Sequence, residues 1–278
     1  MLSLGQFKLE SSFKHIAILD NCSISFLQDL DRKGIATYRL FQTYDCVVIP
    51  SWIKNEFVGS AMTEQYLQSL IANGVLLLEA NEIDYADLIP SIKAERMILD
   101  LFFAGSNLFS QVLAYLHKNV KKYDPLDLDD SHEWINALYD NWPMTNGSIK
   151  KNAGEVSITI LANILSLFYP KLKTITVFAQ DRDTFAAHNK AVEIIQSCYG
   201  HIPMQNTPVS FKSNDFLFKQ LYSAGLIDKS TIGLIRDSER TVMYSITQSD
   251  GSIVSLNRKI SKDDFNSLLD SPGFSIVF

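Results

Sequence analysis

The stretch HIAILDNCSISF, residues 15–26, decides the fold that we expect for this chain. HIAIL is an apolar run of strand length that ends at Asp20, and a helical pattern follows from Ser23 to about Arg32. A buried strand that passes directly into a helix is typical of a parallel sheet covered by helices. Asp20 would then lie at the carboxyl edge of that sheet, where open α/β sheets bind their ligands.

Three further apolar runs repeat this arrangement along the chain. They are CVVI at 46–49, VLLL at 75–78 and TITVFA at 174–179, with helical patterns between them. Strands that alternate with helices favour a mainly parallel sheet with helices on both faces. We therefore expect an α/β fold, a three-layer α/β/α sandwich whose strands begin at about residues 15, 46, 75 and 174.

Two segments extend beyond this repeating arrangement. Residues 84–152 have helical patterning without an obvious strand, so we expect a helical insert there. Residues 229–278 predict a hairpin about Asp250-Gly251, then a short helix and a final strand. We divide the chain into a main domain, residues 1–228 including the insert, and a small α+β appendage, residues 229–278.

The composition is that of an ordinary soluble globular protein. Of the 278 residues, 46% are hydrophobic and 20% are charged. The longest apolar run, residues 158–169, is too short to span a bilayer, and the first residues lack the features of a secretory signal. We expect a cytoplasmic protein with no membrane partner.

The cysteines and the net charge narrow the chemistry. Cys22, Cys46 and Cys198 form no CxxC pair, so neither a zinc site nor a disulfide framework is indicated, and we expect all three to be buried. The net charge of −6 disfavours a chain-wide electrostatic attraction to nucleic acid. Contacts to phosphates would instead come from bound metal ions or from local basic clusters.

Acidic residues lie just past the strand ends or on the helical turns that follow. They are Asp20, Glu56, Glu155 and Asp181, with Asp183 as a fifth candidate. The carboxyl ends of parallel strands share one edge of the sheet, so residues far apart in sequence would meet there. Carboxylate clusters that hold one or two Mg²⁺ or Mn²⁺ ions suit phosphodiester hydrolysis. We expect the first four to be catalytic metal ligands and Asp183 to be a further ligand.

Four segments together resemble the motifs of PIN-domain nucleases. HIAILDNCSISF resembles the opening strand with the first acid, and VVIPSWIKNEF resembles the second motif, in which Pro-Ser leads into a helix that bears an acid. AGEVSITILA looks like the Gly-Glu helix start, and ITVFAQDRDTF looks like the strand before an Asp-x-Asp loop. LIANGVLLLE and FLFKQLYSAGLI also resemble family elements, so the likeness extends from about residue 14 to residue 228. Residues 84–152 and 229–278 depart from compact members of the family.

The resemblance implies a Mg²⁺- or Mn²⁺-dependent phosphodiester hydrolase, most directly an endoribonuclease that cuts RNA. For a toxin-type or defence member it also implies an inhibitory, antitoxin-like protein partner, and homo-oligomer formation stays open. The family includes DNA-flap nucleases and inactive members, so a catalytically inactive RNA-binding or regulatory module is the alternative. A phosphatase of the haloacid-dehalogenase type fits less well, because that chemistry needs a second Asp where this chain has Cys22.

Ordinary structural roles compete with functional ones around these acids. Asp20 and Glu155, taken singly, would cap or stabilise helix N-termini. For Asn21 and Ser51 we favour turn and cap hydrogen bonds over a role beside a metal ion, and for Arg182 an ion pair and a substrate contact are equally open. The lysines of the insert are candidates for RNA phosphate contacts, although a solvated face is the more ordinary role: Lys118, Lys121, Lys122, Lys150 and Lys151. Its aromatic residues favour a helical core over a base-stacking platform: Phe102, Phe103, Phe109, Trp134 and Trp142.

Overall fold

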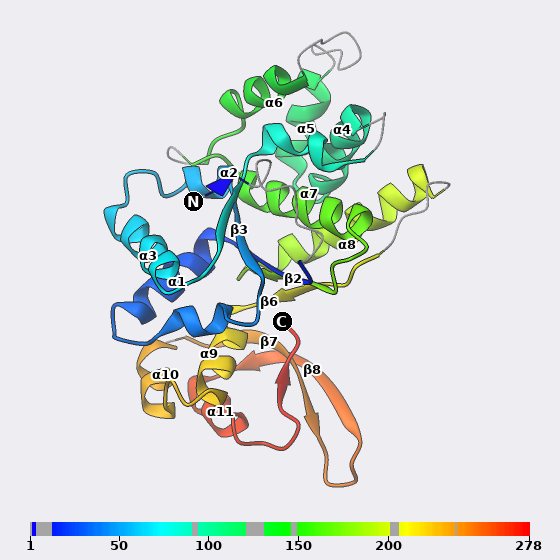
Figure 1. Ribbon diagram of the computed structural model, residues 1–278. Helices are drawn as coiled ribbons and strands as arrows, with labels where there is room; N and C mark the ends of the chain where they lie inside the picture. Colours follow the sequence, from blue (N-terminus) through cyan, green and yellow to red (C-terminus); the bar gives the residue numbers. More distant parts are fainter. Residues whose placement is uncertain are drawn as a thin grey trace.

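The computed structural model describes residues 2–3, 13–90, 94–120, 131–145, 149–200, 206–236 and 238–278. Its centre is a six-stranded sheet in the order β1-β4-β3-β2-β5-β6, in which every neighbouring pair is parallel (Figure 1). The strands are β1 (Leu2–Ser3), β2 (His15–Leu19), β3 (Cys46–Pro50), β4 (Leu77–Ala80), β5 (Thr174–Phe178) and β6 (Val209–Lys212). The predicted parallel sheet is confirmed, whereas the sequence reading predicts neither β1 nor β6.

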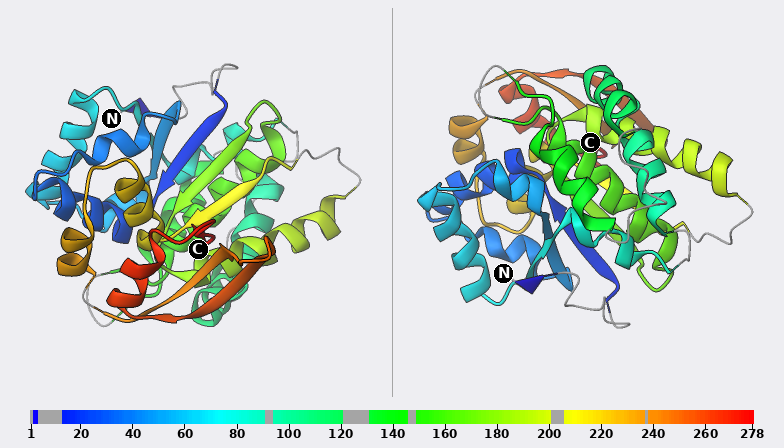
Figure 2. Two further views of the ribbon diagram at one scale, coloured as in Figure 1. Left: turned by 90° about the horizontal axis from the view of Figure 1, so that it is seen from below. Right: turned by 90° about the horizontal axis from the view of Figure 1, so that it is seen from above.

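Helices cover both faces of this sheet, which gives an α/β fold with helix, sheet and helix layers (Figure 2). One face carries α1 (Asn21–Asp31) and α3 (Ala61–Ala72), and the other carries α7 (Ala153–Phe168) and α8 (Arg182–Tyr199). All five residues of β3 are buried, because a strand covered on both faces has no exposed side. Residues 156–167 of α7 are buried in an unbroken run, as expected from its all-round apolar sequence.

The insert is helical, as predicted. It contains the short 3₁₀ helices η2 (Glu82–Asp84) and η3 (Ala86–Leu88), followed by α4 (Ala94–Gly105), α5 (Ser110–Asn119) and α6 (Ser131–Asp140). Phe102, Phe109, Trp134 and Trp142 are buried, and Phe103 packs partly buried against them. The ring centroids of Phe102 and Trp134 lie 5.5 Å apart. The prediction that these aromatic residues form a helical core is therefore confirmed.

The C-terminal segment forms a second, smaller sheet. Antiparallel strands β7 (Arg240–Thr247), β8 (Ile253–Ile260) and β9 (Ser275–Ile276) lie in the order β8-β7-β9, and Gly251 turns the predicted hairpin with a φ of 81°. The remaining helices are η1 (Thr37–Phe41), α2 (Ser51–Asn55), α9 (Asn214–Ser223), α10 (Lys229–Ile235) and α11 (Lys262–Leu268). Figure 1 shows the small sheet below the main one, beside α9.

Candidate functional site

Two of the predicted acids are the N-cap residues of helices that follow strands. Asp20 comes directly after β2, and its carboxylate accepts a hydrogen bond of 2.8 Å from the amide of Asn21 in the first turn of α1. Asp181 comes soon after β5, and its carboxylate accepts one of 2.8 Å from the amide of Asp183 in α8. Helix N-termini favour negative charge, which explains locally why both positions are acidic. The parallel pairing of β2 with β5 brings the two N-caps to the same edge of the sheet.

The four carboxylates act on one another electrostatically. Burial, followed by repulsion from Glu155 and Glu56, raises the pKa of Asp20 from 3.8 to about 7. Burial and repulsion from Glu155 raise the pKa of Glu56 to about 7, against an opposing hydrogen bond from Asn21. Burial raises the pKa of Glu155 as well, and Asp181 and then Asp183 add to the increase. The acids that the sequence selects therefore lie near enough to one another at this edge of the sheet for their charges to raise the pKa values of Asp20, Glu56 and Glu155.

Glu56 reaches this cluster from the end of a very short helix. It is the C-cap residue of α2, which ends at Asn55, so it lies at the end of a short helix and not within the acid-bearing helix that the second motif implies. The side-chain amide of Asn21 donates a hydrogen bond of 3.0 Å to Glu56 Oε2. The expectation of a mere turn or cap role for Asn21 is therefore wrong, because this residue orients one carboxylate beside another.

Gly154, at the start of α7, allows this close approach. A Cβ atom at this position would lie 2.8 Å from Glu56 Oε1 and would overlap Cδ1 of Ile53 in α2. A side chain at this position would force the side chains of Ile53 and Glu56 to move, so glycine is favoured for packing rather than for its backbone angles. Asn152, the N-cap residue of α7, has a φ of 52° and adds a side-chain hydrogen bond that lowers the pKa of Glu155.

Cys22 lies within the acidic cluster. Burial, followed by repulsion from Asp20, Glu155, Glu56 and Asp181, raises the pKa of its thiol to about 12. Cys22 nevertheless has an exposed surface, and so does Cys198. The prediction that all three cysteines are buried therefore holds only for Cys46. Cys22 is the second residue of α1 and lies at the open edge of the sheet rather than in the core, which explains why it is exposed and Cys46 is not.

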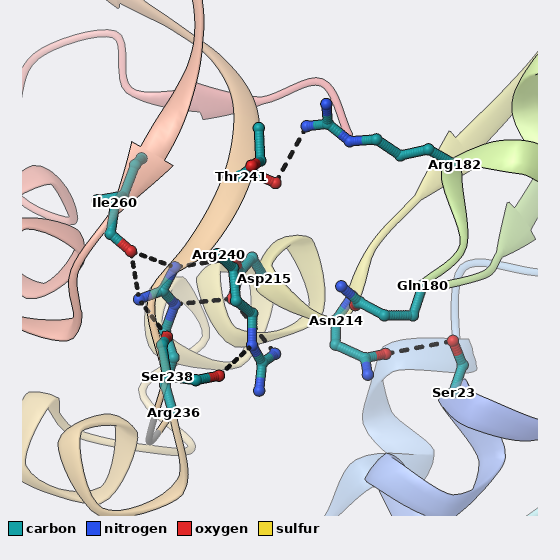
Figure 3. A network of polar contacts seen from close by, with 10 residues as sticks. All are labelled: Ser23, Gln180, Arg182, Asn214, Asp215, Arg236, Ser238, Arg240, Thr241 and Ile260. Carbon is teal, nitrogen blue, oxygen red and sulfur yellow. Dashed lines mark hydrogen bonds and ion pairs between the residues drawn. The ribbon is translucent and has the colours of Figure 1, made fainter.

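A polar network fixes the loop that carries Asp181 and Asp183 (Figure 3). Gln180 Oε1 accepts a hydrogen bond of 3.0 Å from the amide of Asn214, and Asn214 Oδ1 accepts one of 3.2 Å from the Ser23 hydroxyl in α1. Arg182 donates to the carbonyl of Thr241 in β7 and to Asn257 Oδ1 in β8, both at 3.0 Å. These hydrogen bonds are neither the ion pair nor the substrate contact that the sequence left open for Arg182. No local pattern in the sequence predicts these hydrogen bonds of Gln180 and Asn214.

The helical insert approaches the site on the side of Glu56. The Tyr139 hydroxyl in α6 accepts a hydrogen bond of 3.2 Å from Asn55 Nδ2, and its ring stacks on Trp52 with centroids 4.6 Å apart. Lys150 Nζ lies 4.2 Å from the centroid of the Tyr139 ring and also donates to the Tyr139 carbonyl. Tyr139 therefore packs against α2 next to Glu56, and Lys150 lies over the face of the Tyr139 ring.

Of the other predicted accessory residues, the structure describes Ser51, Lys118 and Lys151. Ser51 donates a hydrogen bond of 2.9 Å to Glu79 in β4, 28 positions along the chain, so the expected turn or cap role is wrong for this residue as well. Lys151 donates to Gln111, and Lys118 is exposed on α5. Lys121 and Lys122 lie outside the described residues. None of these contacts tests a role in phosphate binding.

The donor set suits a hard divalent cation, because it consists almost entirely of carboxylate oxygens. In the part of the chain that the structure describes, no three Asp, Glu, His or Cys side chains are grouped tightly enough to enclose a metal ion as they stand. Mutual repulsion gives a physical reason for such an open arrangement. Asp20, Glu56, Glu155 and Asp181 therefore fit a metal site in chemistry, with Cys22 as the one sulfur atom among them.

Comparison with models of protein families, with curated proteins and with solved structures finds no match for the chain. Among the helices that the structure describes, none is both long enough and apolar enough to cross a membrane.

Proposed function

We propose that the chain is a Mg²⁺- or Mn²⁺-dependent nuclease with a PIN-like fold, and that it acts as an endoribonuclease. The observation that carries the proposal is the mutual repulsion of Asp20, Glu56 and Glu155, together with Asp181, at one edge of a parallel sheet. These residues come from segments separated by as many as 161 positions. Such a cluster lowers stability unless cations neutralise it, which is the physical reason to expect a metal-dependent activity.

The proposed ligands are Asp20, Glu56, Glu155 and Asp181, with Asp183 as a fifth carboxylate. Bound ions would supply the lower pKa of a coordinated water and the charge that offsets the phosphate. The chain's own contribution is positioning. Asn21 holds one oxygen of Glu56, and the N-termini of α1 and α8 hold Asp20 and Asp181 through backbone amides.

RNA is the substrate that the resemblance to PIN-domain nucleases implies, and the net charge of −6 is compatible with it only if binding is local. Lys150 is a candidate for such a local contact, because it lies over the ring of Tyr139, whose hydroxyl is bonded to Asn55, the residue before Glu56. An antitoxin-like inhibitory partner belongs to the same proposal and is expected to cover this edge of the sheet.

The test is cleavage of labelled RNA by the purified full chain in Mn²⁺. Asp20→Asn and Asp181→Asn are expected to reduce the rate by on the order of 100-fold or more, because each removes a charged ligand but keeps the cap. Asp29→Asn is the matched control, since Asp29 lies on α1 but forms only an exposed ion pair with Arg32. Equal rates for all three variants and the wild type would reject the site.

Calorimetry with Mn²⁺ separates the catalytic proposal from its alternative. A nuclease is expected to bind Mn²⁺ in the wild type and to lose that binding in Asp20→Asn. Binding of single-stranded RNA without Mn²⁺ binding or cleavage would instead indicate a catalytically inactive RNA-binding module.

A further inference from the structure

Among the residues that the structure describes, one carboxyl group outside the acidic cluster has no exposed surface at all. Glu82, in η2, has 0% relative exposure. Its Oε1 accepts a hydrogen bond of 2.9 Å from the amide of Trp52 and one of 2.6 Å from the hydroxyl of Ser157. The Ser157 hydroxyl also lies 2.9 Å from the Tyr85 hydroxyl, so the carboxyl group belongs to a buried polar chain. No pattern in the sequence identifies Glu82 as special.

The two donors belong to the helices that carry two of the clustered acids. Trp52 lies in the first turn of α2, and Glu56 is the residue at which α2 ends. Ser157 lies in α7, two residues after Glu155. One oxygen atom of Glu82 therefore accepts hydrogen bonds from both helices, four residues before Glu56 in α2 and two residues after Glu155 in α7.

The packing of α7 against α2 at Gly154 also restricts how these two helices can move. The start of α7 meets α2 where Gly154 leaves no space for a Cβ atom between itself and Ile53. A shift of either helix would therefore change the packing at Gly154 and the hydrogen bonds to Glu82 together. The separation of Glu56 from Glu155 follows from the same contact.

A carboxyl group is a costly means of joining two helices in the core. Burial raises the pKa of Glu82 to about 8, and its second oxygen, Oε2, has no hydrogen-bond partner among the described residues. An apolar side chain would avoid this cost but would leave the Trp52 amide and the Ser157 hydroxyl unpaired. The gain from the carboxyl group lies in fixing two donors at one point.

We propose that Glu82 is a positioning residue that sets the separation between Glu56 and Glu155 by accepting hydrogen bonds from both of their helices. The consequence for metal binding rests on the proposed nuclease function. The geometric claim concerns only the distance between two carboxylates and is testable without metal or substrate.

The test compares two serine-to-alanine substitutions in the same helix. Ser157→Ala removes the hydrogen bond to Glu82. Ser166→Ala removes an equally buried hydrogen bond, of 2.7 Å to the Thr207 carbonyl, at the far end of α7. Glu82→Gln keeps the Oε1 acceptor, whereas Glu82→Leu removes it. The serine pair decides the question if Glu82→Leu does not fold.

The first readout is the Mn²⁺ concentration that gives half-maximal RNA cleavage. Ser157→Ala and Glu82→Leu are expected to raise it by about tenfold, in the range found for residues that orient metal ligands. Ser166→Ala and Glu82→Gln are expected to stay within about twofold of the wild type. The same increase in Ser157→Ala and Ser166→Ala would show a general loss of stability and would overturn the proposal.

The second readout is the distance between the carboxylates of Glu56 and Glu155 in crystal structures of the metal-free proteins. Loss of the shared acceptor is expected to change this distance by about 0.5 Å or more in Ser157→Ala and Glu82→Leu, but not in Ser166→Ala or Glu82→Gln. An unchanged distance in Ser157→Ala and Glu82→Leu would overturn the proposal.

The two readouts keep the two proposals apart. A wild-type protein that neither binds Mn²⁺ nor cuts RNA would reject the nuclease function, and the distance between the two carboxylates in the metal-free proteins would still decide whether Glu82 positions them.

Discussion

Asp20 is the most deeply buried of the clustered acids, and its protonation links the stability of the molecule to pH. Its pKa is about 7 in the folded protein and 3.8 without the fold. The folded state therefore holds the proton more tightly than the unfolded chain does between these values. The stability that this group contributes is fully present below about pH 4 and is lost as the pH rises through about 7.

We expect the metal-free wild type to lose about 2 kcal/mol more of its free energy of unfolding than Asp20→Asn between pH 5 and pH 8. The amide of the variant cannot titrate and keeps the N-cap, so the comparison isolates one proton. Urea unfolding at both pH values in a chelating buffer measures the difference. Parallel pH profiles for the two proteins would show that Asp20 is ionised normally in the fold.

The absence of a side chain at Gly154 lets α7 and α2 pack closely together. We expect Gly154→Ala to lower the free energy of unfolding by about 1–3 kcal/mol through overpacking, and to lower the rate of RNA cleavage, because the new methyl group meets Ile53 and Glu56. Gly105→Ala is the control, since a Cβ there lies 3.4 Å or more from its neighbours. Thermal unfolding and cleavage assays on both variants check the prediction. Equal tolerance of the two alanines would contradict it.

At the scale of the elements, the acids at the starts of α1 and α8 have two separable roles. Asp181 caps α8 through the amide of Asp183, and asparagine caps a helix about as well as aspartate. We expect Asp181→Ala to reduce the free energy of unfolding by about 1 kcal/mol and Asp181→Asn to change it by less than about 0.5 kcal/mol. Both variants are expected to lose RNA cleavage. Chemical unfolding and cleavage measured side by side show whether the charge or the cap matters.

The elements also show what the sequence can predict. Runs that are buried on both faces, such as β3 and the part of β2 that follows His15, are apolar throughout and are recognised directly. β6 is not recognised, because its four residues VSFK are mostly half-buried and give neither an apolar run nor a clear alternation.

The candidate site divides in the same way. Its acids are predicted because each follows a strand end or opens a helix, which is a local feature. The hydrogen bonds of Asn21 to Glu56 and of Glu82 to Ser157 join segments 35 and 75 positions apart, so they depend on packing that no local pattern contains. The exposure of Cys22 also depends on which way α1 faces at the sheet edge.

At the scale of the whole molecule, the C-terminal sheet shares a hydrophobic cluster with the main domain. Leu30 of α1 and Phe218 of α9 pack in one cluster with Val242, Tyr244 and Phe265. Because Arg182 also contacts β7 and β8, the small sheet is in contact with the loop that carries Asp181. Loss of the small sheet would therefore remove two hydrogen bonds from the residue next to Asp181 in the candidate site.

The connection between the two parts includes a buried ion pair. Arg236, with 0% side-chain exposure, donates to Asp215 Oδ1 at 3.0 Å and also to the Ile260 carbonyl, while Asp215 is 2% exposed (Figure 3). Arg240 approaches the same carboxylate at 3.9 Å. Removal of Arg236 leaves a buried carboxylate with only a partly exposed partner, which is far more costly than the loss of a surface pair.

We expect Arg236→Ala to lower the free energy of unfolding by about 3–5 kcal/mol. Lys229→Ala, which removes the exposed pair with Asp270, is expected to leave it nearly unchanged. Urea unfolding followed by tryptophan fluorescence reports on the main domain, because Trp52, Trp134 and Trp142 all lie there. A loss below about 1 kcal/mol in Arg236→Ala, by this measurement, would mean that the small sheet separates without weakening the main domain. A large loss would mean that the two parts unfold together, as their shared cluster leads us to expect.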